Sequence, residues 1–163
     1  FKNNYGRVKG FTYEGGIRVP MIATWPAKIE AGSKSNHISA FYDVLPTFNE
    51  IANVKNDYES DGISFYNALT NENKQEAHEY LYWEFAGYKG QVAVRMGKWK
   101  MVWKNIKTGN KEVELYDLDI DIQEQNNVME QHPKMLEKFF EIIKEEHTTP
   151  ENSSFIIKAL ETI

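Results

Sequence analysis

The fold is decided by a central stretch that reads Val92-Ala93-Val94-Arg95-Met96-Gly97-Lys98-Trp99-Lys100-Met101-Val102-Trp103-Lys104. Its two apolar runs, 92–96 and 99–104, are rich in β-branched and aromatic residues, which favours two strands. The glycine and lysine between them leave room only for a tight hairpin, so the two strands are predicted to be antiparallel. A period of two places three large side chains on one face of the second run: Trp99, Met101 and Trp103.

Two further runs flank this hairpin. Residues 79–85 alternate with a period of two, and residues 112–118 form a fourth run after a turn signal at 108–110. A helix is predicted to begin at Pro133 and to cover one face of the sheet. Its apolar stripe consists of Leu136, Phe139, Phe140 and Ile143. The second half of the chain therefore predicts an α+β fold, with a four-stranded antiparallel sheet covered by a C-terminal helix.

The first half is predicted to contain one strand and one helix. The apolar run 17–25 suits a buried strand, with Pro20 at its start or edge because proline removes a backbone donor. The second half of 38–54 suits a helix, in which Pro46 takes an early position that needs no N–H. Shorter helical segments are expected at 65–69 and 155–163.

Composition excludes several classes of protein. The chain has 163 residues, of which 41% are hydrophobic, so a packed core is expected. The formal net charge is -5 and the basic residues form no stripe, which argues against nucleic acid as a partner. The absence of cysteine excludes disulfides, zinc–thiolate sites and a cysteine nucleophile within the chain. No apolar run approaches the roughly 20 residues that a membrane-spanning helix requires.

Catalytic patterns are scarce in the sequence. The four histidines are His37, His78, His132 and His147. They are too scattered to form a zinc-binding pair, so each is interpreted as a surface or loop residue. Asp117, Asp119 and Asp121 alternate, but the glycine of a calcium-binding loop is missing, which favours a solvated acidic loop. The sequence therefore predicts no metal ligand in this chain.

The start of the chain suggests a fragment. The first residue is Phe1 rather than methionine, and nothing nearby resembles a signal peptide. The opening residues read as the middle of a loop, so we expect the chain to be part of a longer protein.

The segment before the predicted strand is the most informative for function, and it reads Lys9-Gly10-Phe11-Thr12-Tyr13-Glu14-Gly15-Gly16-Ile17-Arg18-Val19-Pro20. Two adjacent glycines indicate an unusual backbone conformation or the close approach of another group. Glu14 and Arg18 flank the glycines and are expected to pair. Lys9 stands in the loop ahead of them, where its ammonium is able to reach an anion.

This segment closely resembles a signature of the formylglycine-dependent sulfatases. Other segments resemble the same family in the same order, over about 1–145. They are Ile22–Ile29, Asp43–Thr47, Asp61–Ser64, Ala93–Lys100, Glu114–Leu118, and Glu124 with Asn127. Agreement of six ordered stretches by chance is very improbable.

The resemblance implies the C-terminal part of an alkaline-phosphatase-like sulfatase fold. Residues 1–55 then form the C-terminal end of the large catalytic α/β domain and contribute one strand and one helix to it. Residues 56–78 are a linker, and residues 79–163 form the small C-terminal subdomain. The implied activity is hydrolysis of sulfate esters on sulfated carbohydrates or aryl sulfates, in an enzyme that is periplasmic, secreted or lysosomal.

The resemblance also implies two groups that this chain does not supply. The family's nucleophile is a formylglycine made from Cys or Ser in a Cys/Ser-x-Pro-x-Arg motif, and no such motif occurs here. The family's calcium is held by residues upstream of this segment, and Asn3 and Asn4 do not match its ligands. We therefore expect the calcium ligands and the formylglycine in a missing N-terminal half, and we expect the fragment alone to be inactive.

Four residues are candidates for the site. Lys9 matches the family lysine that contacts the substrate sulfate, which implies both catalysis and substrate binding. The residues interpreted as scaffold around it are Tyr13, Glu14, Gly15, Gly16 and Arg18. Arg7, two residues before Lys9, is a second candidate for substrate binding. Trp83 and Glu84 are candidates for lining the substrate cleft, because an aromatic face and a carboxylate suit a sugar, although a packed strand aromatic is the alternative.

Two other interpretations are compatible with the sequence. One is a non-catalytic carbohydrate-binding or assembly module of the same fold. The other is a phosphoester hydrolase of the alkaline phosphatase superfamily. An upstream Cys/Ser-x-Pro-x-Arg motif favours the sulfatase, its absence favours the module, and a Thr or Ser nucleophile with two zinc ions favours the phosphoester hydrolase.

Overall fold

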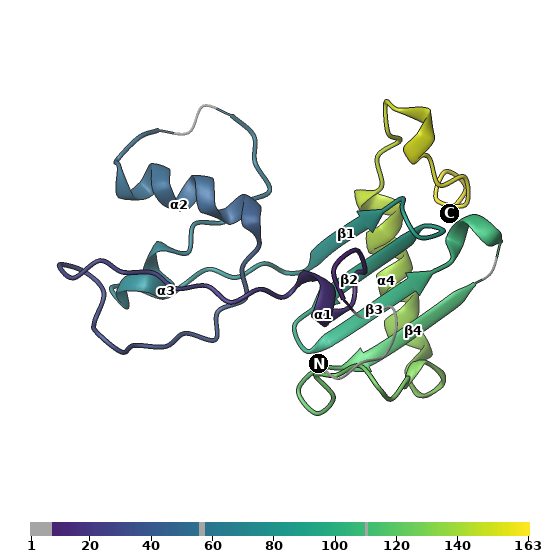
Figure 1. The fold of residues 1–163 in the computed structure, drawn as a ribbon, viewed down its shortest axis with the longest axis horizontal. Helices are drawn as coiled ribbons and strands as arrows, with labels where there is room; N and C mark the ends of the chain where they lie inside the picture. The colour runs from purple at the N-terminus through teal and green to yellow at the C-terminus, as the bar shows by residue number, and fades with distance from the viewer. Residues whose placement is uncertain (1–7, 56–57, 110) are drawn as a thin grey trace. The chain divides into compact units, whose positions relative to one another are not determined.

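A computed structural model describes residues 8–55, 58–109 and 111–163 (Figure 1). The chain divides into two compact units, one formed by residues up to Val19 together with Tyr80–Ile163, the other by Pro20–Glu79. This division differs from the one predicted from the sequence, because residues 8–19 belong with the sheet of the second half.

The larger unit contains a four-stranded antiparallel sheet. Its strands are β1 (Leu81–Phe85), β2 (Gln91–Met96), β3 (Trp99–Lys104) and β4 (Glu112–Asp117), in the order β1-β2-β3-β4. The predicted meander is therefore confirmed. The β2–β3 hairpin turns at Gly97, whose φ of 56° lies in the left-handed region that glycine tolerates best.

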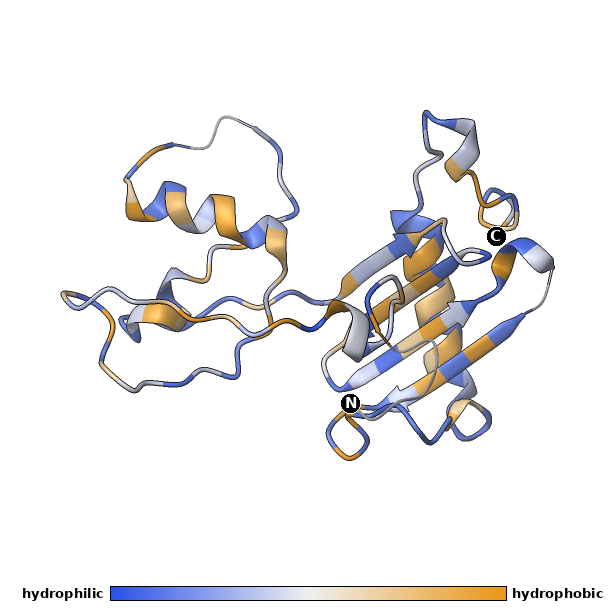
Figure 2. Ribbon diagram, in the orientation of Figure 1, coloured by the Kyte–Doolittle hydropathy of each residue, from blue (hydrophilic) through white to orange (hydrophobic). Residues whose placement is uncertain are grey.

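One face of the sheet packs on α4 (Pro133–Glu146), which lies behind the strands in Figure 1. The predicted C-terminal helix is confirmed. The orange residues on the strands and on α4 in Figure 2 include this core. Its buried members are Val92, Val94, Met101, Trp103, Ile106, Leu115, Phe139, Ile142, Ile143, Ile157 and Leu160.

The tail contributes to the same core without the predicted helix at 155–163. It contains the 3-10 turn η4 (Ser153–Phe155) and further turns. Ile157 and Leu160 are buried. Packing of these two side chains, rather than helical hydrogen bonding, therefore holds the tail against the core. Of two other 3-10 turns, η2 (Ile106–Thr108) lies between β3 and β4, and η3 (Met129–Gln131) lies between β4 and α4.

The opposite face of the sheet is covered by the N-terminal segment 11–17. This segment ends in the short helix α1 (Glu14–Ile17), which lies in front of the strands in Figure 1. A second, smaller core joins the two, and it consists of Tyr13, Ala93, Val102, Tyr116 and Leu118. The sheet is thus buried on both faces by segments from opposite ends of the sequence.

The smaller unit, Pro20–Glu79, contains η1 (Phe41–Asp43), α2 (Val44–Ile51) and α3 (Tyr66–Thr70). The predicted helix with an early proline is confirmed, because Pro46 is the third residue of α2. The short helix expected at 65–69 is confirmed as α3. Asp43 ties these elements together, since its carboxylate accepts hydrogen bonds from the N–H groups of Ala40 at 2.6 Å and Ile63 at 2.9 Å.

The strand predicted over 17–25 does not form. Residues 18–25 have no regular secondary structure, and Ile22 is 94% exposed. An apolar run becomes a strand only when a neighbouring strand accepts and donates its backbone hydrogen bonds, and none of the described residues does so.

In the part of the chain that the structure describes, no helix is long and apolar enough to cross a bilayer.

Candidate active site

Lys9 lies in a turn that leads into α1. The turn is closed by a hydrogen bond of 3.1 Å from the Phe11 N–H to the Val8 carbonyl, and Gly10 follows Lys9 with a φ of +92°. The Lys9 side chain is exposed, and its ammonium has no hydrogen bond or ion pair to another described residue. Its catalytic role stays a prediction. Arg7, the second cation of the hypothesis, lies outside the described residues.

A close backbone approach explains Gly16, the second of the paired glycines. A Cβ at Gly16 would lie 2.0 Å from the Phe11 carbonyl oxygen, a separation that no side chain tolerates. The N–H of Gly16 donates to the Tyr13 carbonyl at 2.8 Å. Any larger residue at Gly16 would therefore open the bend that carries Lys9.

Glu14 anchors the bend to the sheet through buried charges. Its carboxylate lies 3.0 Å from the Lys100 ammonium and 3.3 Å from the Arg95 guanidinium. The predicted pair with Arg18 is confirmed at 3.7 Å. The side chain of Lys100 is 0% exposed, so this ammonium depends on protein carboxylates alone.

Glu124 is the second carboxylate on Lys100. One of its oxygens lies 2.9 Å from the Lys100 ammonium, and the other accepts a hydrogen bond of 2.8 Å from the Glu14 N–H. Burial raises the pKa of Glu124, against the attraction of the ammonium. The loop after β4 therefore clamps the start of α1 through both charge and backbone.

Gln91 holds the backbone on both sides of Phe11. Its amide oxygen accepts from the Thr12 N–H at 3.3 Å, and its amide nitrogen donates to the Gly10 carbonyl at 3.3 Å. Tyr13 donates its hydroxyl proton to Glu114. The backbone that follows Lys9 is therefore fixed at several points on one face of the sheet.

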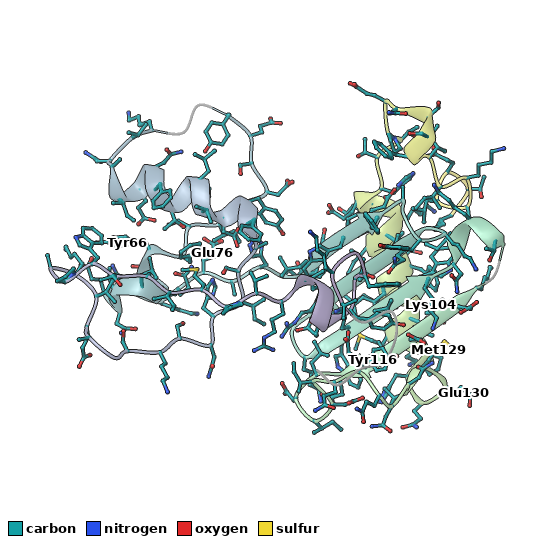
Figure 3. All side chains as sticks on the ribbon, in the orientation of Figure 1. Tyr66, Glu76, Lys104, Tyr116, Met129 and Glu130 are labelled. Atoms are coloured by element: carbon teal, nitrogen blue, oxygen red, sulfur yellow. The ribbon has the colours of Figure 1, made fainter. Side chains whose placement is uncertain are left out.

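This face also carries Lys104 and Tyr116, which come from β3 and β4 and are labelled in Figure 3. The Lys104 ammonium lies 2.7 Å from the carboxylate of Glu114, which also accepts the hydrogen bond from the Tyr13 hydroxyl. Burial raises the pKa of Glu114, but the hydrogen bonds from Lys104, Tyr13 and Tyr116 outweigh it and lower the pKa overall. Glu114 is therefore kept ionised, as an acceptor for the Tyr13 hydroxyl of the segment that follows Lys9.

Trp83 and Glu84 fall on opposite faces of β1, as alternation along a strand requires. Trp83 packs on the smaller core beside Tyr13, the face that carries the Lys9 loop. Glu84 lies on the α4 side, where it accepts from the Tyr82 hydroxyl at 2.8 Å and lies 2.9 Å from His147 Nδ1. The structure therefore does not bring the two together, and their role in substrate binding stays a prediction.

His78 and His147 lie in loops, as the sequence interpretation expected, but both are paired with carboxylates. His78 Nε2 lies 2.8 Å from a carboxylate oxygen of the buried Asp43. His147 contacts Glu84 and also Glu161 at 3.1 Å. Burial lowers the pKa of His147, but the hydrogen bonds to both carboxylates outweigh it and raise the pKa. Single-residue patterns could not reveal these long-range partners.

The described ranges contain no group of three or more His, Cys, Asp or Glu side chains able to hold a metal ion. The acidic loop after β4 has other uses for its carboxylates. Asp117 pairs with Lys98 at 2.6 Å, and Asp121 accepts from the N–H groups of Gln125 and Asn126, each at 2.8 Å. These residues do not fit a calcium site.

Comparison with protein families gives a match over residues 6–149, which includes the Lys9 loop and the whole sheet. The matching family is described as N-sulphoglucosamine sulphohydrolase, C-terminal.

Curated relatives include two proteins of Bacteroides thetaiotaomicron. An N-acetylgalactosamine-6-O-sulfatase is 28% identical over 81% of this chain and 28% of its own length. An N-acetylglucosamine-6-O-sulfatase is 33% identical over 74% of this chain and 23% of its own length. The chain thus spans about a quarter of the length of these relatives.

Solved structures include a protein in complex with its substrate D-glucosamine-2-N,6-O-disulfate. It superposes with a TM-score of 0.61 at 27% identity, over 74% of this chain and 26% of that one. The fold is therefore shared with part of a larger protein.

Proposed function

This chain belongs to the family of N-sulphoglucosamine sulphohydrolase C-terminal domains, and from that premise we propose that it is the C-terminal part of a sulfatase acting on sulfated glycans. The observation that carries the proposal is the family match over 6–149, which includes the loop that presents Lys9. In this role the chain supplies the sulfate-contacting lysine and the small subdomain that fixes it.

Sulfated amino sugars are the substrate class that we propose. Two relatives are named as 6-O-sulfatases of N-acetylgalactosamine and N-acetylglucosamine, and a similar solved structure holds a disulfated glucosamine. The family further suggests an exported or lysosomal enzyme.

Lys9 is proposed to act by charge. An ammonium beside a sulfate ester stabilises the negative charge that develops as the S–O bond breaks, and it favours departure of the alcohol oxygen. Its exposed side chain suits this role, while the backbone after it is held by Gln91 and Glu14. Arg7 is proposed as a second substrate-binding cation.

The nucleophile and the calcium are proposed to belong to residues outside this chain. The sequence has no Cys/Ser-x-Pro-x-Arg motif, and the described residues contain no cluster that fits calcium.

Exposed apolar side chains in the smaller unit are a second argument that this chain is part of a larger protein. Examples are Ile22 and Phe41, the latter 80% exposed. Surfaces of this kind are usually covered by other protein.

The proposal is tested by Lys9→Ala in the sulfatase that contains these residues. With p-nitrophenyl sulfate, kcat is expected to fall about 10²–10³-fold, as when one stabiliser of transition-state charge is removed. The melting temperature should be unchanged, since Lys9 is exposed. The matched control is the exposed Lys34→Ala, which should keep wild-type turnover. A normal kcat in Lys9→Ala would remove Lys9 from the site.

A further inference from the structure

The turn between β1 and β2 carries an exposed aromatic ring and an exposed cation, Tyr88 and Lys89, to which the proposed chemistry assigns no role. We propose that Tyr88 and Lys89 form a sugar-binding subsite beside Lys9, which holds a glycan residue next to the one that loses its sulfate. The inference rests on the proposed function and specifies how that site recognises a chain of sulfated sugars.

The backbone of this turn is unfavourable for the residues that it contains. The Gly90 N–H donates to the Gly87 carbonyl at 2.9 Å, so Tyr88 and Lys89 are the two central residues. Their φ values are 45° and 70°, both left-handed. Hairpin turns with two left-handed residues favour Asn-Gly, because most other side chains clash with the backbone in that conformation. Such strain tends to persist where it serves a function.

The Tyr88 ring lies directly against the residues that follow Lys9. It stacks on Phe11 with ring centroids 4.9 Å apart and an angle of 8° between the planes. A Cβ at Gly10 would lie 2.6 Å from Tyr88 Cε2, so the absence of a side chain at Gly10 makes room for the ring. Tyr88 is nevertheless 59% exposed. The exposed ring therefore lies against the residue that follows Lys9 in the chain.

Phe85 extends the surface. Its ring centroid is 5.9 Å from that of Tyr88, and it is 40% exposed. Gly87 makes room for it in the same way, because a Cβ there would lie 2.6 Å from the Phe85 ring. Gly10 and Gly87 thus make room for the exposed rings of Tyr88 and Phe85. These two rings form the aromatic platform of the proposed subsite.

The chemistry of the platform suits a sulfated sugar. Exposed aromatic faces pack on the apolar C–H face of a sugar ring, and the Tyr88 hydroxyl, which has no hydrogen bond to another described residue, is available to a sugar hydroxyl. Lys89 is exposed and forms no ion pair within the described ranges. A lysine binds a sulfate as a point charge, so ring and cation together select an anionic saccharide.

The test is a titration of the 163-residue protein with a chondroitin 6-sulfate tetrasaccharide, followed by amide NMR. Shifts are expected at 8–11 and 85–90. The double variant Tyr88→Asn, Lys89→Gly introduces the pair that the turn prefers, so it should stay folded while its Kd rises at least about tenfold. The control Phe155→Asn, Lys158→Gly removes an exposed ring and an exposed cation elsewhere and should bind as the wild type does.

Absence of binding by the wild-type chain, a double variant with an unchanged Kd, or shifts confined to other regions would overturn the subsite. The measurement needs no turnover, so its outcome is independent of the Lys9→Ala kinetics. Loss of the proposed function appears only in that kinetic assay, and loss of the subsite only in this titration.

Discussion

Lys100 lies between Glu14 and Glu124, at 3.0 Å and 2.9 Å from their carboxylates, and none of the three side chains reaches solvent to a useful extent. An ammonium removed from water is tolerated only when charged partners replace its hydration. The two carboxylates come from the signature loop and from the loop after β4. The same ammonium therefore pairs with both carboxylates and joins segments that are remote in sequence.

Lys100→Met is expected to lower the free energy of unfolding of the larger unit by about 3–5 kcal/mol, because it leaves two buried carboxylates side by side. Urea unfolding is followed by tryptophan fluorescence, since Trp83, Trp99 and Trp103 all belong to the sheet. Lys34→Ala serves as the control, because that lysine is exposed in the other unit. A loss no larger than in the control would contradict the role assigned to Lys100.

His147 is expected to make stability depend on pH. Its pKa in the folded protein is raised above the usual 6.5, so the folded state binds a proton that the unfolded state releases. This contribution is complete below about pH 6.5 and is lost as pH rises through the folded pKa. Unfolding free energies at about pH 6 and about pH 8.5 should therefore differ, with the larger value at the lower pH.

The same comparison in His147→Gln should show a smaller difference. Glu161→Gln, which removes one of the two carboxylates on His147, should fall between the variant and the wild type. An identical pH dependence in all three proteins would exclude His147 as its source.

At the scale of elements, the motif Asp43–Thr47 links helix α2 to the chain before α3. The Thr47 hydroxyl donates to the Asp43 carbonyl at 2.7 Å and accepts from the Phe65 N–H at 3.0 Å. Both bonds are buried, so water cannot replace them. This explains a threonine at the start of a helix.

Thr47→Val keeps the shape of the side chain but removes the acceptor. The Phe65 N–H is then buried without a partner, which should destabilise the smaller unit by about 1–3 kcal/mol. Hydrogen exchange at the Phe65 amide should become correspondingly faster. Thr47→Ser retains the hydroxyl and should stay close to wild type; equal exchange in the two variants would argue against the hydroxyl as the cause.

The elements that sequence predicted correctly are those whose signals are local. The sheet strands and α4 follow from periodicity and turns within a few residues, as does the Glu14–Arg18 pair four positions apart. The strand at 17–25 failed because an apolar run specifies burial but cannot supply a partner strand. Lys100 and Glu124 were missed as partners of Glu14, because 86 and 110 positions separate them from it. The contact of the Tyr88 ring with Gly10 was also missed, because 78 positions separate the two residues.

At the scale of the whole molecule, the purified 163-residue chain is expected to hydrolyse no aryl sulfate. It supplies the proposed lysine but neither the nucleophile motif nor a metal cluster among its described residues. The measurement is release of p-nitrophenol from p-nitrophenyl sulfate. The Lys9→Ala chain controls for a contaminating sulfatase, and turnover that disappears in this variant would contradict the prediction.

The span of the Glu14 contacts has a consequence for biosynthesis. A chain emerging from the ribosome exposes the signature loop early, yet Glu124, whose carboxylate receives the Glu14 N–H, is made 110 positions later. Domains fold as they are completed during translation. The loop that carries Lys9 is therefore expected to fold only after β4 and the loop beyond it have been synthesised, because Glu124 lies in that loop.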